Sequence, residues 1–457
     1  MGYRKKMCRT EVRTMHHDLT NGNITRSLLW FAFPIMVGNL LQQFYNVVDT
    51  LIVGQFLGKD ALAAVGSSYS LMTFLTSILL GLCMGSGVAF SIYYGKKDSV
   101  RLKNSIFLAF CMIGGIALLI TGIVFSGMDM ILHLLQVPAD IYEMMWEYLW
   151  MVFWGILATF LYNFFSCLLR AAGNSVVPLV FLGISAVLNI GLDLLFVVVL
   201  KRGVQGAAEA TVISQYVSGV GLFIYTLLFF REFCPRREDM RWRKEILKEI
   251  LHLSSMTCIQ QSVMNFGILM VQGLVNSFGS VVMAAFSVAV KIDSFSYMPV
   301  QDFGNAFSTF VAQNYGAGKK ERIREGIRSA VRTSFLFSVG VSALVVLFAK
   351  PLMLIFVKPE EVEILNVGIR YLRIEGSFYC LIGFLFLLYG YFRAVKRPGI
   401  SLVLTVISLG TRVALAYILS ANEAIGVDGI WASVPIGWFL ADAAGYLYYR
   451  REKKKTL

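Results

Sequence analysis

The chain has 457 residues, of which 57% are hydrophobic and only 15% are charged. Soluble domains average about 45–50% apolar and about 25% charged residues, so the composition excludes a water-soluble protein. The net charge of +13 does not indicate nucleic-acid binding, because most of the 41 basic residues lie in alternate loops and at the two termini.

Long apolar stretches recur along the whole chain, separated by short polar breaks. Each is long enough to cross a bilayer, which takes about 20 residues of helix. Unalternating runs of this length exclude a transmembrane barrel, so the sequence predicts an all-α membrane protein with 12 transmembrane helices. The second and eighth spans exceed one straight crossing, and we expect them to tilt, bend or project into water. The predicted spans are 24–53, 61–94, 105–126, 141–168, 176–200, 206–230, 250–276, 282–315, 333–357, 368–392, 399–420 and 427–449.

The second half of the chain repeats the first. Gly58 and Tyr94 match Gly279 and Tyr315 at an offset of 221, and later pairs match at an offset of 223. Each half has an even number of spans, which predicts two parallel six-helix repeats, an N-lobe and a C-lobe, around a central cavity. The predicted domains are an N-terminal tail at 1–23, the N-lobe at 24–230, a cytoplasmic linker at 231–249, the C-lobe at 250–449 and a basic tail at 450–457.

The basic residues also predict the orientation in the membrane. Those of the two tails, the linker and alternate loops fall on one side, which the positive-inside rule assigns to the cytoplasm. We therefore expect a multi-pass membrane protein, with the lipid bilayer as its partner and both termini cytoplasmic. The first 23 residues show no cleavable signal pattern.

Two carboxylates inside the predicted spans of the first half are candidate functional groups, because a charge in the bilayer costs several kcal/mol. Asp49 shares a helix face with Gln42 and Asn46, and Asp193 shares one with Asn189. If the two carboxylates converge in an apolar setting, a proton or Na⁺ must neutralise them. The alternative interpretation is that they only hydrogen-bond to polar side chains on neighbouring helices.

The second half departs from the first in its charges. Arg412 matches Asn189 and Ala416 matches Asp193, so the predicted cation site is one-sided. Lys291 and Asp293, in the eighth span, form either a structural ion pair or a second titrating cluster. Glu375 and Asp442 lie nearer helix ends, where charges reach water or neighbouring polar groups more easily, and are interpreted as structural.

Two other classes of protein are disfavoured by missing motifs. The chain has no GxxxxGK[ST] phosphate-binding loop, which excludes an ATP-driven pump acting as a single chain. Its four histidines show no metal-ligand spacing and no Ser/His/Asp arrangement is visible, so we expect neither an enzyme nor a cofactor.

Over nearly its whole length, the chain resembles the multidrug and toxic compound extrusion (MATE) family of antiporters, in its bacterial form. The segments that carry the resemblance are 48–54 with the preceding Pro34, 169–174, 189–193, 206–214 and 312–319. The resemblance implies that the first half binds the coupling cation, H⁺ or Na⁺, through Asp49, Asn189, Asp193 and Thr211. Some relatives carry an acidic residue in the seventh helix, where this chain has Gln260 and Gln261, so these two are at most accessory or cavity-lining, as are Gln42, Asn46, Lys291 and Asp293.

The function that the resemblance implies is secondary active efflux by alternating access. A functional monomer would export small amphipathic organic cations and drugs in exchange for H⁺ or Na⁺. A flippase for lipid-linked oligosaccharides, which has a related fold, is the alternative, and a receptor is a third class. The acidic residues of the first half favour cationic cargo over the diphosphate of a lipid-linked sugar.

Overall fold

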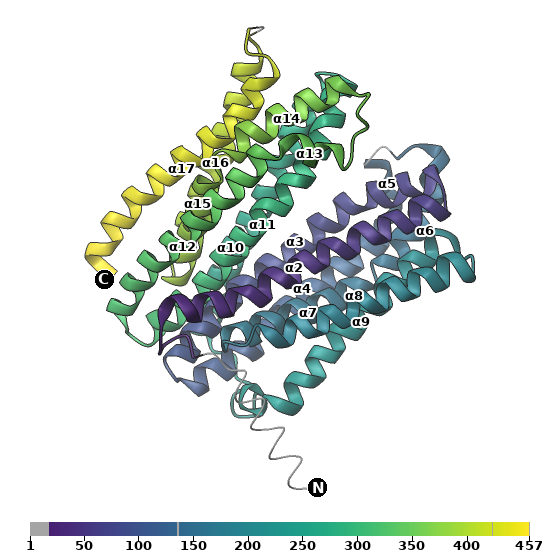
Figure 1. Cartoon of the computed structure of the whole chain (residues 1–457). Coiled ribbons are helices and arrows are strands. Elements are labelled where there is room, and N and C mark those ends of the chain that lie inside the picture. The colour runs from purple at the N-terminus through teal and green to yellow at the C-terminus, as the bar shows by residue number, and fades with distance from the viewer. Residues whose placement is uncertain (1–17, 135–136, 423, 457) are drawn as a thin grey trace. The chain divides into compact units, whose positions relative to one another are not determined.

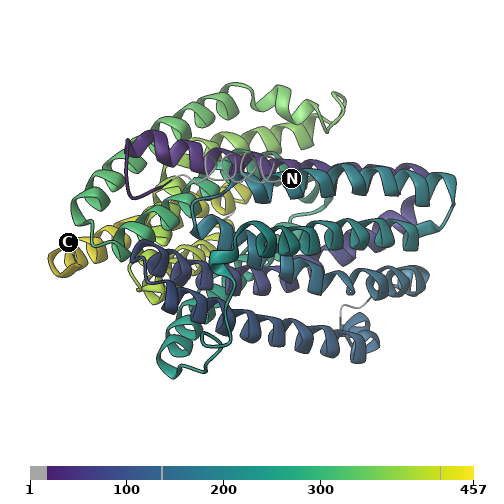
Figure 2. The same cartoon turned by 90° about the horizontal axis from the view of Figure 1, so that it is seen from below.

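The computed structural model of the chain describes residues 18–134, 137–422 and 424–456. Throughout these residues the regular structure is helical and contains no strand, as the view from below shows (Figure 2). Helices satisfy their own backbone hydrogen bonds, which a segment surrounded by lipid requires. The predicted all-α class is confirmed.

The helices follow one another with short connections (Figure 1). In chain order they are α2 (Ile24–Phe56), α3 (Lys59–Gly95), α4 (Ser99–Ser126), α5 (Met128–Leu134), α6 (Ala139–Val152), α7 (Gly155–Ala171), α8 (Val176–Asp193), the π-helix η1 (Leu194–Val199), α9 (Gly203–Phe229), the 3₁₀ turn η2 (Arg231–Phe233), α10 (Lys244–Asn276), α11 (Ser280–Gly316), α12 (Lys320–Leu347), α13 (Ala349–Leu354), α14 (Val362–Gly376), α15 (Tyr379–Ala394), α16 (Pro398–Ser420) and α17 (Val427–Thr456).

Within the described chain, nine single helices are long and apolar enough to cross a membrane, and two bent helix pairs bring this number to as many as eleven. The bent pairs are α6 with α7, at 43°, and α14 with α15, at 51°. They correspond to the fourth and tenth predicted spans. The twelfth predicted span is α17, which carries Asp442 and ends in a basic segment.

The second and eighth predicted spans, which we expect to tilt, bend or project into water, are longer than one straight crossing. Those spans are α3 and α11, each one continuous helix of 37 residues. The breaks lie in the fourth and tenth spans, where the intrahelical hydrogen-bond ladder is interrupted between Val152 and Gly155 and between Gly376 and Tyr379.

The element bounds confirm the internal repeat. α3 and α11 have equal lengths, as do α4 and α12 with 28 residues each. Gly58 and Gly279, which immediately precede α3 and α11, have φ angles of 89° and 96°, a backbone conformation that favours glycine. The two broken spans are likewise repeat partners. Each half therefore folds through the same series of elements.

The chain divides into two compact units. The first holds Val37–Cys258, and the second holds Leu19–Met36 with Ile259–Leu457. Their limits fall within α2 and α10, so the first turns of α2 pack with the second unit. Leu19 is part of this packing, because its carbonyl accepts hydrogen bonds from Asn314 and Arg322. The lobe bounds 24–230 and 250–449 remain a proposal from the sequence.

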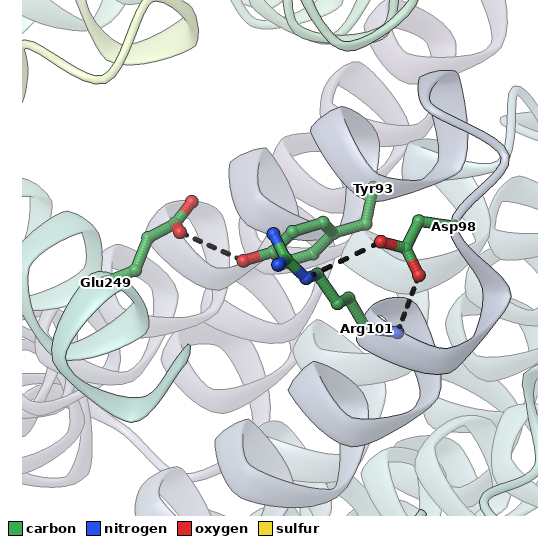
Figure 3. A network of polar contacts seen from close by, with 4 residues as sticks. All are labelled: Tyr93, Asp98, Arg101 and Glu249. Carbon is green, nitrogen blue, oxygen red and sulfur yellow. Dashed lines mark hydrogen bonds and ion pairs between the residues drawn. The ribbon is translucent and has the colours of Figure 1, made fainter. Parts of the chain in front are cut away.

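Polar contacts tie α10 and the preceding linker to the first unit. The Tyr93 hydroxyl of α3 donates a hydrogen bond of 2.9 Å to Glu249 of α10 (Figure 3). Nearby, Asp98 caps α4 by accepting from the backbone N–H of Arg101. The buried side-chain amide of Asn104 donates at 2.7 Å to two linker carbonyls, those of residues 239 and 241.

The same face of α3 approaches α10 closely at two glycines. A Cβ added at Gly81 would lie 2.6 Å from the Cα of Cys258, and one added at Gly85 would lie 2.5 Å from the Cα of Ser254. The spacing is the GxxxG pattern that lets membrane helices touch backbone to backbone. Ser254 uses this proximity to donate to the carbonyl of Leu82 at 3.0 Å.

Candidate functional site

Three helices of the first unit bring the predicted cation-binding residues together. Asp49 comes from α2, Asn189 and Asp193 come from successive turns of α8, and Thr211 comes from α9. The carboxyl groups of Asp49 and Asp193 lie close enough to interact directly. Residues up to 162 positions apart in the sequence are thus joined in one polar cluster.

Thr211 enters the cluster because α9 packs closely against α8. The first turns of α9 contain the buried small residues Ala207 and Ala208, which permit a short interhelical distance. The Asn189 side-chain amide donates to the Thr211 hydroxyl at 3.4 Å, and that hydroxyl donates to the Ala207 carbonyl at 3.1 Å. Thr211 is therefore oriented with its remaining lone pair open to another ligand.

The oxygens of this cluster are short of hydrogen-bond donors. Asp193 is fully buried and Asn189 is 2% exposed. One side-chain oxygen of Asp49, both of Asp193 and that of Asn189 are buried without a hydrogen-bond partner among the described residues. Buried carboxylates without donors are unstable as bare charges, so this oxygen-only donor set fits a proton or a small hard cation such as Na⁺.

Two tyrosines also belong to the site, and sequence reasoning missed both. Tyr148 of α6 is buried and lies within electrostatic range of both Asp49 and Asp193. Tyr45 of α2 lies one turn before Asp49 and interacts with it as well. A tyrosine in an apolar helix looks like an ordinary core residue. The signal that was available is the repeat itself, since Tyr148 is one of its matching positions.

The backbone changes immediately after Asp193. α8 ends at that residue and continues as the π-helix Leu194–Val199, with the N–H of Leu200 bonded to the carbonyl of Leu195 at 2.8 Å. Widened turns of this kind are rare and often occur at functional sites. Apolar side chains that include Ile52, Val53 and Val197 pack beside the cluster and keep the local environment dry.

The accessory residues predicted from the sequence are placed differently from one another. Gln42 is exposed and lies near Tyr45, and Asn46 donates to Gln43 at 3.3 Å, so both are engaged along α2 itself. Gln260 is buried on α10, within the second unit, and Gln261 is half-buried beside it.

The second unit separates Lys291 from Asp293. Lys291 is exposed, whereas Asp293 is 5% exposed and accepts a hydrogen bond of 2.6 Å from the Tyr379 hydroxyl. In the described chain no ion pair joins the lysine to the aspartate. Of the two alternatives for these residues, the geometry leaves no support for the structural ion pair.

Of the two surroundings expected for Glu375, water and neighbouring polar groups, the structure provides the second, with Tyr371 and Arg412 nearby. Glu375 does lie at a helix end, the end of α14, but that end is the break within the tenth span, and the residue is 2% exposed. Both carboxyl oxygens of Asp442, on α17, are also buried, without a hydrogen-bond partner in the described part of the chain. The interpretation of both residues as structural stays a prediction from the sequence.

Comparison with known proteins agrees with this architecture. The MatE family model matches residues 34–195 and 254–418. "Probable multidrug resistance protein YpnP" of Bacillus subtilis is 30% identical over 449 residues, covering 96% of this chain and 98% of the relative. "Probable multidrug resistance protein NorM" of Thermotoga maritima is 28% identical, covering 89% of this chain and 88% of that protein.

Among solved structures, a multidrug resistance MATE family transporter of the MOP superfamily in an outward-facing conformation is similar, with a TM-score of 0.90. It is 24% identical and the match covers 96% of this chain and 98% of that one. The likeness establishes the fold, twelve membrane helices in two lobes. With the family model matching well over half of the residues, the chain belongs to the MatE family of membrane transporters, and it is not an enzyme.

Proposed function

We propose that this chain is a secondary active exporter that exchanges H⁺ or Na⁺ for amphipathic organic cations. The observation that carries the proposal is the meeting of Asp49 and Asp193, two intramembrane carboxylates with buried oxygens that lack donors. Such a pair gains stability from any cation that neutralises it. It therefore has the chemistry of a coupling site.

The four predicted ligands contribute either negative charge or neutral oxygen atoms. The carboxylates of Asp49 and Asp193 supply the negative charge, while the amide oxygen of Asn189 and the hydroxyl of Thr211 complete an oxygen shell. A proton needs one carboxylate only, whereas Na⁺ needs several oxygens together, so the same set serves either ion. Entry of one charge down a membrane potential supplies about 2.3 kcal/mol per 100 mV.

The substrate class rests on two supports. The relatives named above carry names as multidrug resistance proteins, and the polar cluster of the first unit is acidic, which favours cationic cargo. Coupling follows if cation and drug favour different conformational states, because each ligand shifts the equilibrium by its differential affinity. The protein would act as a monomer in a bacterial plasma membrane, with both termini cytoplasmic.

The deciding experiment measures efflux of ethidium from proteoliposomes under separately imposed H⁺ and Na⁺ gradients. We expect one gradient or both to drive transport, and Asp49→Asn and Asp193→Asn each to abolish the driven component. Asp60→Asn, which changes an exposed carboxylate in the first turn of α3, is the matched control and should transport normally.

Thermal unfolding of each purified variant shows whether it is folded. Driven transport that persists in both site variants refutes the site. If neither gradient moves ethidium or any other organic cation in the wild type, the antiporter proposal fails and a lipid-linked substrate becomes the next candidate.

A further inference from the structure

The second unit buries a charged cluster of its own. Asp293 of α11 is 5% exposed and Glu375 of α14 is 2% exposed. The guanidinium of Arg412, from α16, lies within electrostatic range of both carboxyl groups. Charges at membrane depth are costly unless they compensate one another, so the grouping of two acids with one arginine needs an explanation.

Tyrosines from α11, α14 and α15 surround the two carboxyl groups. Tyr379 donates to Asp293 at 2.6 Å, Tyr371 interacts with Glu375, and Tyr297 lies within electrostatic range of Asp293 and Arg412. Two further aromatic rings close the site, because Phe286 and Trp431 stack on each other at 5.3 Å and both pack edge-on against Tyr371. Water is therefore largely excluded from the two carboxyl groups, whereas the Arg412 side chain is half-buried.

The hydrogen-bonding of the cluster is incomplete. Glu375 Oε2 and Arg412 Nε are both buried without a hydrogen-bond partner among the described residues. Arg412 forms no direct ion pair there either, so its charge acts on the two carboxyl groups through space. The cluster is electrically neutral when Arg412 is charged and the two acids share one proton.

The internal repeat shows what Arg412 replaces. Arg412 matches Asn189 and Tyr371 matches Tyr148, both at the offset of 223. In the first unit, that tyrosine and asparagine flank two acids that have no basic partner in the cluster. In the second unit, a tyrosine again borders two acids, but a guanidinium stands at the position of the asparagine.

We propose that Arg412 is a resident cation that compensates Asp293 and Glu375 and thereby keeps the second unit from binding an exchangeable Na⁺ or additional proton. An arginine remains charged under all physiological conditions and cannot dissociate from the chain. Arg412 is thus a specificity-determining residue that confines cation exchange to the first unit. This last step rests on the proposed function, whereas the compensation of charge does not.

The test measures the Tm of the purified full-length protein with and without Na⁺, at acid and at alkaline pH. The background is Asp193→Asn, which removes the response of the first unit. In this background we expect Arg412→Gln to gain a new stabilisation by Na⁺ or by acid, a rise in Tm of about 2 °C or more. Arg412→Lys keeps the charge and should show no such gain.

Adding Glu375→Gln to Arg412→Gln should cancel the new stabilisation by Na⁺ or acid. In the double variant, neutral glutamines replace both the arginine and one of the two acids. If Arg412→Gln does not fold but the version with Glu375→Gln does, the proposal also stands, since an uncompensated acid explains the loss. A folded Arg412→Gln without any new cation response overturns it. So does a failure of Glu375→Gln to restore folding when Arg412→Lys folds, because Arg412 is then only a packing residue.

The two proposals fail in different ways. If Asp193→Asn alone retains the whole cation response of the wild type, the first-unit site is refuted. The comparison of Arg412→Gln with Arg412→Lys in the same background still decides the role of Arg412.

Discussion

Individual side chains in the first unit differ in what each can offer a cation. Asp193 is fully buried and its two oxygens lack donors in the described structure, whereas Asp49 has one such oxygen. Thr211 carries no charge, but its hydroxyl is held by Asn189 and Ala207. Because its contribution is a neutral oxygen, Thr211 can distinguish Na⁺ from a proton, which the aspartates cannot.

Thr211→Ala is expected to weaken the binding of Na⁺ more than the binding of H⁺. Loss of one neutral oxygen ligand is worth about 1 kcal/mol, so Na⁺ affinity should fall roughly fivefold to tenfold, while protonation of the carboxylates stays near normal. Thr211→Ser keeps the hydroxyl and serves as the control. Titration of Na⁺-driven and H⁺-driven efflux in proteoliposomes checks this, and equal losses for both ions would contradict it.

Tyr148→Phe should leave the fold intact but alter coupling. The ring packs in the buried apolar core, and only the hydroxyl, which faces Asp49 and Asp193, is removed. We expect a thermal stability close to wild type and a shifted pH profile of efflux, because the carboxylates lose a polar neighbour. An unchanged pH profile would show that Tyr148 is only a core residue.

At the scale of elements, the first unit depends on a close contact between α3 and α10. Gly81 and Gly85 let the two backbones approach, and Ser254 bonds across the contact to the carbonyl of Leu82. Nearer the start of α10, the hydrogen bond from Tyr93 to Glu249 adds a second contact with α3 (Figure 3). The helix that opens the second half of the chain is thus anchored in the first unit.

Gly85→Ala is expected to destabilise the protein, because its Cβ would lie 2.5 Å from backbone atoms of α10 that have no room to move. Overpacking of this kind costs about 1–3 kcal/mol. Gly122→Ala in α4 is the control, since nothing lies within 4 Å of a Cβ at that position. Thermal unfolding followed by size-exclusion chromatography compares the two, and equal Tm values would refute the tight contact.

At the scale of the whole molecule, one architecture is used twice with different charges. The first three helices of each half have equal lengths, a glycine precedes the second helix of each half, and the fourth span of each half is broken. One half gathers acids without a base, and the other gathers acids around Arg412. The backbone is repeated, whereas the charges at the matching positions differ.

The distribution of basic residues predicts that both ends of the chain face the cytoplasm. Green fluorescent protein fused after residue 457 should therefore fluoresce in bacterial cells, and alkaline phosphatase fused at the same place should be inactive. A fusion of alkaline phosphatase in the loop around Lys358 is the positive control, since that loop lies on the opposite side in the prediction. An active phosphatase at the C-terminus would contradict the predicted orientation and place that end outside the cytoplasm.

The sequence by itself determined the helical class and the repeat, and it predicted Asp49, Asn189 and Asp193 as functional candidates, whereas Thr211 entered only through the resemblance to the family. Apolar runs need no partner to identify them, and an ionisable residue within such a run is conspicuous because burying a charge is costly. The sequence did not show where spans break. Val152 stands among apolar residues, and the polar stretch around Gly376 is too short to divide an apolar span in two.

Only the tertiary structure decided which groups meet. Tyr148 joins the acids of the first unit from a different helix, and Tyr379 likewise reaches Asp293 from another helix. Glu375 is buried because a break brings a helix end inside the bundle. Spacing along one helix specifies a face, but the partner of that face depends on how neighbouring helices pack, and packing is a property of the folded chain.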